Sequence, residues 1–365
     1  MEIRQISDLH EFESLRDNWK KLLPQNPVQD VFYTWEWLFA WWKHYRKGRE
    51  LWLITAWRSD ELVGIAPLML VERRKYGLKL RVLCNIGTPD VDVGGFIVQN
   101  GDPQIYTAVA KYLIDRKRLW DVLELNEIRC DGPETRLLIP QFENSGYVTH
   151  QKDNHHFYLP VQGEWEGYLN RLPSKFRREL RSKLRRIEEQ SKLILEHHIG
   201  KEVTWKDIST IFKINEYGHF PHLYRSTEER AFQREIFELM RNQGWLNIFL
   251  LYIDDQPAAF NYGFTYNKRF EDWRAGFSTQ YSDLSLGRIL YLMTIEDCHK
   301  RAYREIDFLC GDEQYKTRWQ TLERAYTQLR FVPRNRLASL AAYIWPPRLK
   351  ALLNARATRK QTTEN

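Results

Sequence analysis

Cysteine is scarce in this chain, which has four in 365 residues and none in a CxxC or other metal-binding spacing. Scattered thiols in a chain of this length are typical of a reducing compartment and do not indicate a disulfide framework. Long apolar runs are missing as well, because no segment approaches the roughly 18 apolar residues of a membrane-spanning helix. The segment from Met1 to Lys20 includes acidic side chains and no apolar signal-peptide core. These absences predict a cytoplasmic protein without a metal centre.

Motifs of two common catalytic strategies are absent too. The sequence has no Gly-x-Ser-x-Gly segment of the kind that exposes a serine nucleophile. No pair of histidines has the spacing and nearby carboxylate of a zinc site. Serine hydrolysis and zinc catalysis are therefore not indicated.

The chain is rich in aromatic residues and mildly basic. Its 14 Trp and 19 Tyr residues and its hydrophobic fraction of 43% are ample for two cores, as expected at a length that exceeds one core. The net charge of +7 favours anionic ligands such as nucleotide-type carriers, nucleic acid or an acidic membrane face. The charge is too small to choose among them.

Two parts of the chain repeat one order of elements: three strands joined by tight turns, a helix, and a further strand. The first part predicts strands at 51–57, 62–71 and 80–86, a helix from Asp102 and a strand at 121–125. The second predicts strands at 246–253, 257–266 and 270–277, a helix from Gly287 and a strand at 306–309. We therefore expect a mixed α/β fold of two similar units, each a mixed sheet flanked by helices. The expected domains are 1–160 and 161–331, followed by a basic tail at 332–365.

The start of the later helix, Ser285-Leu286-Gly287-Arg288, is a candidate phosphate site. A glycine at a helix start leaves backbone N–H groups open to the oxygens of a phosphate or diphosphate. The matching helix of the first part begins Asp102-Pro103, where a carboxylate and a missing N–H disfavour an anion. If either part binds a phosphate-bearing carrier, we expect the second to do so.

A dense polar run, Gly311 to Trp319, follows the last strand of the second part. Acidic, basic and phenolic side chains in such a run are candidates for proton transfer. The acidic ones, Asp312 and Glu313, could instead pair with Lys316 or Arg318 and fix the loop. A phosphate site next to proton-transfer groups predicts group transfer from a phosphate-bearing carrier.

The order of elements resembles the GNAT acyltransferase fold, and several segments resemble one branch of it. That branch is the CelD-type tandem-GNAT group of bacterial cellulose and exopolysaccharide loci, with a more distant similarity to Fem-type peptidyl transferases. The resemblance runs in consistent order from Phe12 to Arg330. The similar segments are Val31 to Leu38, Ala66 to Leu68, Asp90 to Asp92, Lys175 to Arg178 and Gly311 to Lys316. The chain departs from the usual GNAT phosphate loop because it keeps a single glycine there.

This resemblance implies transfer of an acyl group from acetyl-CoA or another acyl-CoA, used as co-substrate, in an opening between the strands at 270–277 and 306–309. The residues that would bind the carrier are Phe277, Ser285, Leu286, Gly287 and Arg288. Tyr315 would protonate the departing thiolate. The other catalytic candidates are Asp312 or Glu313 as the base, and Lys316.

The acceptor would be an amine or hydroxyl of a sugar, a polysaccharide precursor or another small molecule. Its candidate binding residues lie in the first unit and are Asp90, Asp92, Trp35 and Trp37. Turn-capping aspartates and core tryptophans are the alternative interpretation.

Two other functions remain open. One is an aminoacyl-tRNA-dependent transferase of the Fem type, with RNA bound by the helix that carries Arg177, Arg181 and Arg185. A solvated helix face is the commoner explanation for such a run. The helical stretch at 165–190 is also short for that family, so nucleic acid is not the expected partner. The other is a non-catalytic component of a polysaccharide-assembly complex, which docks on a membrane face or a partner through the basic tail.

Overall fold

The computed structural model describes residues 1–89, 91–218, 224–311 and 314–345. The chain forms two units: unit 1 contains Met1–Asn154 and the described chain from Ala325 on, and unit 2 contains His155–Arg324. Unit 2 is therefore continuous in sequence, whereas unit 1 is built from both ends of the chain. Part of the segment at 161–331 that the sequence analysis assigned to the second domain lies in unit 1.

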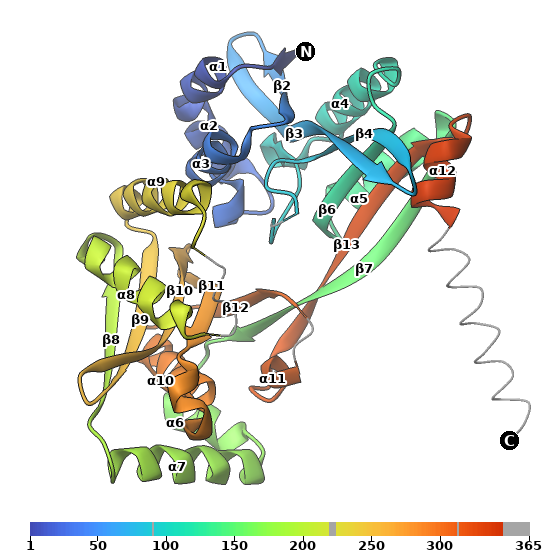
Figure 1. The fold of residues 1–365 in the computed structure, drawn as a ribbon. Coiled ribbons are helices and arrows are strands. Elements are labelled where there is room, and N and C mark those ends of the chain that lie inside the picture. Colours follow the sequence, from blue (N-terminus) through green and yellow to red (C-terminus); the bar gives the residue numbers. More distant parts are fainter. Residues whose placement is uncertain (90, 219–223, 312–313, 346–365) are drawn as a thin grey trace, which may run out of the picture. The chain divides into compact units, whose positions relative to one another are not determined.

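Unit 1 has a mixed sheet with the strand order β1-β2-β3-β4-β6-β13-β7, and short β5 pairs with β3 (Figure 1). The strands are β1 Glu2–Ile6, β2 Arg49–Arg58, β3 Glu61–Lys75, β4 Leu78–Asn85, β5 Ile97–Val98, β6 Val122–Arg129, β7 Tyr147–Pro160 and β13 Leu322–Pro333. The helices are α1 Leu9–Ser14, α2 Arg16–Leu22, α3 Trp35–Tyr45, α4 Pro103–Asp115, α5 Pro133–Asn144 and α12 Leu337–Tyr343. The short 3-10 helices are Leu23–Gln25, Val31–Tyr33 and Gln99–Gly101.

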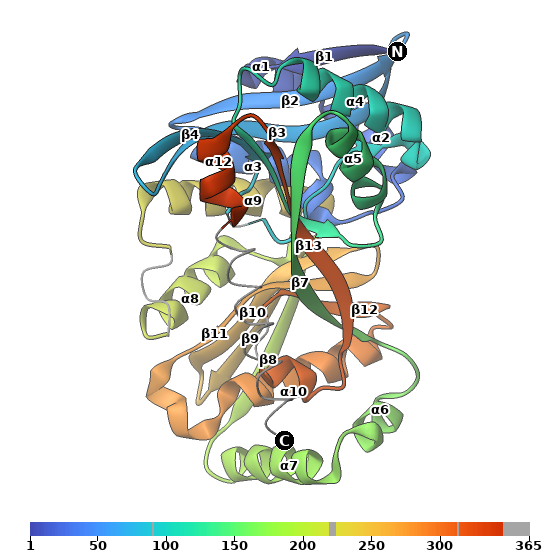
Figure 2. The ribbon, with the colours of Figure 1, turned by 90° about the vertical axis from the view of Figure 1, so that its right-hand side faces the viewer.

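Alternation along β2 divides the core of unit 1 between the two faces of its sheet. Trp52, Ile54 and Ala56 pack on one face with buried residues of α4 and α5. Figures 1 and 2 show these two helices on one side of the sheet and α1–α3 on the other. The predicted start of α4 is confirmed, because the Asp102 carboxylate accepts a hydrogen bond from the Gln104 N–H and proline follows at the first helical position.

Unit 2 has a mixed sheet with the strand order β7-β12-β11-β10-β9-β8. Its further strands are β8 Leu193–Ile199, β9 Leu246–Ile253, β10 Gln256–Tyr266, β11 Arg269–Phe277 and β12 Glu305–Cys310. The helices are α6 Trp165–Arg171, α7 Ser174–Glu188, α8 Trp205–Glu216, α9 Thr227–Gln243, α10 Leu286–Lys300 and α11 Gln314–Thr317. The 3-10 helices are Gly200–Glu202 and Thr279–Leu284. Buried residues of α6, α7 and α10 form one core with β9, β11 and β12, and α8 and α9 cover the other face of the sheet (Figure 1).

The predicted repeat is confirmed by the strand pairing. In unit 1 an antiparallel meander β2-β3-β4 is followed by α4 and by β6, which pairs parallel to β4. In unit 2 the meander β9-β10-β11 is followed by α10 and by β12, which pairs parallel to β11. The repeat extends one step further than expected, because a helix and a strand follow in both cases: α5 and β7, then α11 and β13.

The two final strands are exchanged between the repeats. The end of β7 belongs to unit 2, where it pairs antiparallel to β12. Most of β13 belongs to unit 1, where it pairs antiparallel to β6. Each unit therefore completes its sheet with a strand that follows the other repeat in the sequence.

Candidate active site

In unit 2 the parallel strands β11 and β12 separate after a short ladder. They pair only where Arg269–Glu271 meets Glu305–Asp307. Beyond that point the ladder of β11 with β10 is irregular opposite Gly263, and Leu309 in β12 has a positive φ of 56°. The ladder between β11 and β12 therefore ends at Glu271 and Asp307. The resemblance to GNAT proteins implied an opening between these two strands.

The backbone N–H of Phe277 points toward the β12 side of β11. The next residue, Ser278, donates its N–H to the Ala258 carbonyl oxygen over 2.8 Å, on the β10 side. Successive N–H groups of a strand point in opposite directions, so the Phe277 N–H faces the other edge. A carbonyl oxygen placed in the opening could accept a hydrogen bond from it.

The start of α10 is bent at Ser285 and not at Gly287. Ser285 adopts the left-handed conformation with φ 55° and ψ 43°, and its carbonyl oxygen accepts from the Arg288 N–H over 3.0 Å. Gly287 has no positive φ; its missing side chain leaves space, since a Cβ there would lie 3.7 Å from the Phe277 ring. The Leu286 side chain is fully buried, so only its backbone is available to a ligand. The expected glycine turn is therefore a serine turn followed by an open first turn of helix.

Two basic side chains are held at this helix start by α7. The Lys183 ammonium donates to the Ser285 Oγ over 2.8 Å, and the Arg288 guanidinium forms an ion pair with Glu179. Both cations lie beside the first turn of α10, whose N–H groups carry the positive end of the helix dipole. The Glu179 carboxylate offsets one of the two cations, so the Lys183 ammonium and the helix dipole are what favour an anion at this point.

A buried chain of polar groups leads from β11 to the polar run after β12. The Asp272 carboxylate accepts from the Tyr291 hydroxyl over 2.6 Å and from the Asn261 amide over 3.1 Å. The Tyr291 hydroxyl lies 3.3 Å from the Tyr315 hydroxyl, and the two rings stack with centroids 5.6 Å apart. The sequence analysis named Tyr315 but missed Asp272, Tyr291 and Asn261. Asp272 could not be singled out from the sequence, because β11 also carries Arg269, Glu271 and Arg274.

The catalytic candidates from the polar run have different positions. Tyr315 lies on α11 and is 37% exposed. Lys316 is buried, with its ammonium donating to the backbone oxygens of Cys310 and Gly311 over 3.0 and 3.4 Å. These bonds give Lys316 a structural role in holding the loop. Asp312 and Glu313 lie outside the described residues.

The corresponding opening in unit 1 is filled by its own chain. β4 and β6 pair only over Val82–Cys84 and Val122–Glu124. Beyond them, the Gly94 N–H donates to the Glu127 carbonyl oxygen over 2.9 Å, and the Tyr33 hydroxyl donates to the Gly94 carbonyl oxygen over 2.6 Å. The chain itself therefore occupies the place that a carrier would need, which favours unit 2 as the carrier-binding unit.

The acceptor candidates of unit 1 are mostly in its core. Trp35 and Trp37 on α3 are 3% and 2% exposed, and the Trp35 indole N–H donates to the Phe12 carbonyl oxygen over 3.1 Å. A sugar could not stack on either ring, so the alternative interpretation of core tryptophans holds. Asp92 is half-buried, and Asp90 lies outside the described residues.

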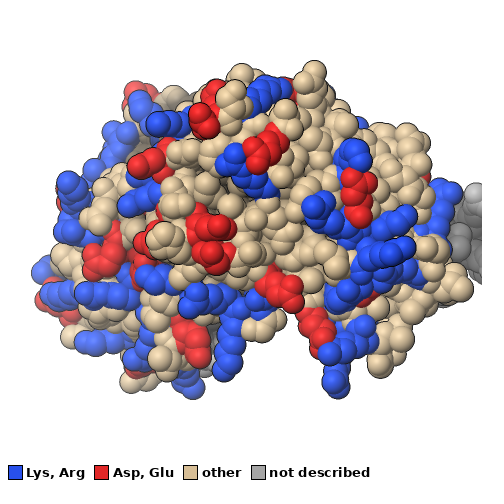
Figure 3. All heavy atoms as spheres, turned by 90° about the horizontal axis from the view of Figure 1, so that it is seen from above, with Lys and Arg blue, Asp and Glu red and all other residues tan. Residues whose placement is uncertain are grey.

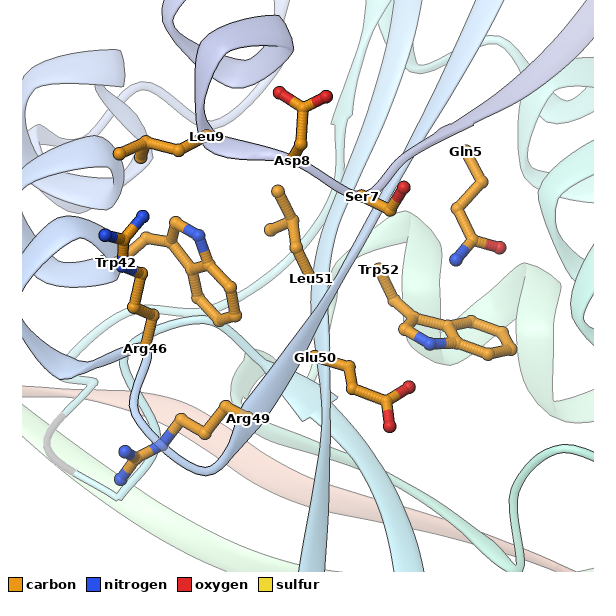
Figure 4. A pocket seen from close by; sticks show the side chains of 10 residues that line it. All are labelled: Gln5, Ser7, Asp8, Leu9, Trp42, Arg46, Arg49, Glu50, Leu51 and Trp52. Carbon is orange, nitrogen blue, oxygen red and sulfur yellow. The ribbon is translucent and has the colours of Figure 1, made fainter.

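A surface pocket of about 470 Å³ lies elsewhere in unit 1 (Figure 4). Basic and acidic side chains both line it, among them Arg46, Arg49 and Glu50. Asp8 at its rim caps α1 by accepting from the Glu11 N–H over 2.8 Å. None of the predicted site residues lines this pocket, and its mixed charges do not indicate a particular ligand.

Residues 174–317 match the model of a family described as "Acetyltransferase (GNAT) domain". The matched segment extends from α7 to α11 and contains the opening, the start of α10 and Tyr315. The whole of the matched segment lies in unit 2. A search of curated proteins finds no significant match.

The fold of the chain is similar to that of solved structures, of which three are described here. FemX is 12% identical with a TM-score of 0.61, and the similarity covers 93% of this chain and 99% of FemX. The tandem GNAT protein from the clavulanic acid biosynthesis pathway is 11% identical with a TM-score of 0.52, and the coverage is 92% and 99%. The C-terminal domain of a putative lysylphosphatidylglycerol synthetase from Agrobacterium fabrum is 10% identical with a TM-score of 0.52, and the coverage is 92% and 95%.

These comparisons confirm the predicted fold class, a mixed α/β GNAT-like architecture. They support acyl transfer as the general reaction. Among the residues that the structure describes, no helix has the length and apolarity needed to cross a membrane.

Proposed function

We propose that unit 2 transfers an acyl group from acyl-CoA, with acetyl-CoA as the simplest donor, to an amine or hydroxyl of a small acceptor. The main support is the separation of β11 from β12 beside the start of α10, inside the segment that matches the GNAT domain. The diphosphate of the carrier binds the N–H groups of the first turn of α10, near Lys183 and Arg288. The thioester oxygen accepts from the Phe277 N–H, and Tyr315 protonates the thiolate.

A sugar or polysaccharide precursor is the acceptor class we propose, on the basis of the CelD-type sequence resemblance. Acceptors can be screened once the donor is known, by following thiol release from acetyl-CoA in the presence of amino sugars, sugar nucleotides and simple amines. If acetyl-CoA binds but no saccharide accepts the acyl group, the proposed acceptor class is wrong and the acyltransferase proposal still holds.

Calorimetric titration with acetyl-CoA tests the carrier site, with two substitutions at one position. Gly287→Asp puts a carboxylate at the helix start, where it repels the diphosphate, and we expect affinity to fall by about tenfold or more, which corresponds to roughly 1.4 kcal/mol. Gly287→Ala is the matched control, since its methyl group would make an ordinary 3.7 Å contact with Phe277. Equal affinities of the two variants would place the carrier elsewhere, and no binding to the wild type would contradict acyl-CoA as the donor.

A tRNA-dependent transferase of the Fem type is the second candidate. It is favoured by the similarity to FemX over nearly the whole chain and by the exposed Arg181 and Arg185 on α7. The face drawn in Figure 3 is that of unit 1, and there Lys and Arg are interspersed with Asp and Glu. Salt-dependent tRNA binding that is lost in the Arg181→Ala/Arg185→Ala variant, together with no binding of acetyl-CoA, would favour this candidate. Binding of neither ligand would leave a non-catalytic role.

A further inference from the structure

We propose that Tyr315, Tyr291 and Asp272 form a proton relay that serves acyl transfer in unit 2, with Tyr315 as both the acceptor and the donor of the transferred proton. This inference rests on the proposed function. It differs from the expectation of a separate acidic base in the polar run. Asp272 and Tyr291 are positioning residues in this scheme, because they act through Tyr315.

The relay connects the protein surface to a buried carboxylate in the opening. Tyr315 is 37% exposed, whereas Tyr291 and Asp272 are 6% and 7% exposed. Asp272 directly follows Glu271, the last residue of β11 that pairs with β12. The side-chain NH2 group of Asn261 donates to one oxygen of the Asp272 carboxylate. The Thr294 hydroxyl donates to the side-chain oxygen of Asn261 over 3.2 Å, which fixes the orientation of the side-chain amide. The Asp272 carboxylate is therefore held by hydrogen bonds from β10, through Asn261, and from α10, through Tyr291.

The number of protons available fixes the direction of these hydrogen bonds. A phenol has one proton to donate. When Asp272 is ionised, Tyr291 donates to it over 2.6 Å and must therefore accept from Tyr315, 3.3 Å away. Tyr315, which is 37% exposed, then takes up the proton of the acceptor. When Asp272 is protonated, both bonds of the relay can reverse, and the Tyr315 proton points outward.

The environment of Asp272 sets its protonation near neutral pH. Burial raises its pKa, hydrogen bonds from Tyr291 and Asn261 and the charge of Lys316 partly oppose this, and the resulting pKa is about 6. Burial, followed by the nearby Asp272, raises the pKa of Tyr291 well above its ordinary value. The same two causes act on the Cys298 thiol, where burial and then the Asp297 and Asp272 carboxylates raise the pKa. Asp272 is therefore the group of this cluster that can change charge near neutral pH.

The relay balances the protons of the transfer. As the nitrogen or oxygen of the acceptor bonds to the acyl carbon, its proton passes to Tyr315, the Tyr315 proton to Tyr291, and the Tyr291 proton to Asp272. The carbon–sulfur bond breaks, and its electron pair remains on sulfur. The relay then runs in reverse and delivers one proton to the thiolate. The products are the acylated acceptor and the free thiol, and the relay returns to its starting state.

Two variants and one control test this relay. Asp272→Asn keeps the shape and removes the titration, and Tyr291→Phe removes the central link. Tyr262→Phe is the matched control, because Tyr262 is equally buried and its hydroxyl bonds Gln233, outside the relay. Thermal melting of each variant verifies folding before the measurements below.

The first measurement needs no substrate. In protein labelled with carbon-13 at the aspartate carboxyl groups, a resonance absent from Asp272→Asn should titrate with a midpoint of about 6. In Tyr291→Phe the midpoint should rise, because the hydrogen bond that stabilises the carboxylate is gone. It should stay unchanged in Tyr262→Phe. A midpoint that does not move in Tyr291→Phe would overturn the relay whatever the activity.

The second measurement is thiol release from acetyl-CoA, with glucosamine or, failing that, water as acceptor. We expect Tyr291→Phe and Asp272→Asn to lower kcat by about 100-fold or more with KM for acetyl-CoA unchanged, and the control to resemble the wild type. The acid limb of the wild-type pH profile should follow the midpoint seen by NMR. A folded Tyr291→Phe variant with wild-type kcat would overturn the relay alone. A wild type that releases no thiol from any acyl-CoA would overturn the proposed function, and the relay with it.

Discussion

Replacing Gly94 by alanine should destabilise unit 1, because this residue lies where the chain fills the opening between β4 and β6. A methyl group at position 94 would lie 2.2 Å from the Asn126 carbonyl oxygen and 3.0 Å from the Asn85 amide nitrogen. Carbon–oxygen contacts in proteins are normally no shorter than about 3.3 Å. The backbone cannot easily retreat, since the Asn126 N–H is bound to the Asn85 side chain over 2.8 Å and the Gly94 N–H to Glu127 over 2.9 Å.

The expected loss can be estimated from this contact. Extra atoms in a packed interior cost about 1–3 kcal/mol, and we expect roughly 3 kcal/mol here because the obstacle is backbone. In a domain of this size each kcal/mol lowers Tm by about 2–4 °C, so the Tm of unit 1 should fall by about 6–12 °C.

Differential scanning calorimetry measures this effect, with Gly167→Ala as the matched control. Gly167 lies in α6 without a positive φ and with no atom within 4 Å of its Cβ position, so alanine there should be neutral or add about 0.4–1 kcal/mol. Acetyl-CoA affinity should be the same in Gly94→Ala as in the wild type, because the opening in unit 2 is unchanged. If Gly94→Ala melts like the control, the segment around Gly94 does not fill the opening and the assignment of the carrier to unit 2 loses its main structural contrast.

Two further predictions concern stability. Burial alone would raise the pKa of Asp297, but the hydrogen bond and charge of His197 and the charge of Arg301 outweigh it and lower the pKa. Because this pKa is lower in the folded than in the unfolded protein, the ionised Asp297 carboxylate stabilises the fold above the unfolded pKa. This stabilisation is lost as pH falls through the folded pKa. Urea unfolding at neutral and acid pH should therefore show a smaller loss of stability in Asp297→Asn than in the wild type, and equal losses would contradict the argument. Lys316→Met leaves two backbone carbonyl groups without their charged donor and should lower the free energy of unfolding by about 1.5–3 kcal/mol; an unchanged urea midpoint would show that the ammonium does not hold the loop.

Most of the fold could be predicted because its signals are local. Period-two alternation placed β9 at 246–253 and helical spacing placed α10, and both elements begin within one residue of the expected position. The strand exchange could not be predicted in this way. The local sequence pattern of β13 does not indicate whether it pairs with β12 or with β6, because both of these strands are largely apolar. The expected domain boundaries and those of the structure differ for this reason.

The candidate site was only partly predictable because its members are far apart in the sequence. Ser285 to Arg288 and Tyr315 are marked by motifs, and the structure brings both to the end of the same sheet. The link from Tyr315 to Asp272 passes through Tyr291, which looks like one more apolar position on a buried helix. Asp272 lies on the α10 face of β11 by simple alternation from Phe270, but no spacing rule says which residue of α10 its carboxylate meets. The tryptophans of α3 show the opposite case, in which a conspicuous cluster serves packing alone.

The exchange of β7 and β13 affects the order in which the protein can fold during synthesis. Every residue of unit 2 has been made before the ribosome reaches Ala325, so the later half can close first. The earlier half must wait, with the edge of β6 unpaired, until nearly the whole polypeptide has emerged. A nascent chain of which Arg324 is the last residue to have emerged would therefore present a complete unit 2 attached to an incomplete and aggregation-prone unit 1.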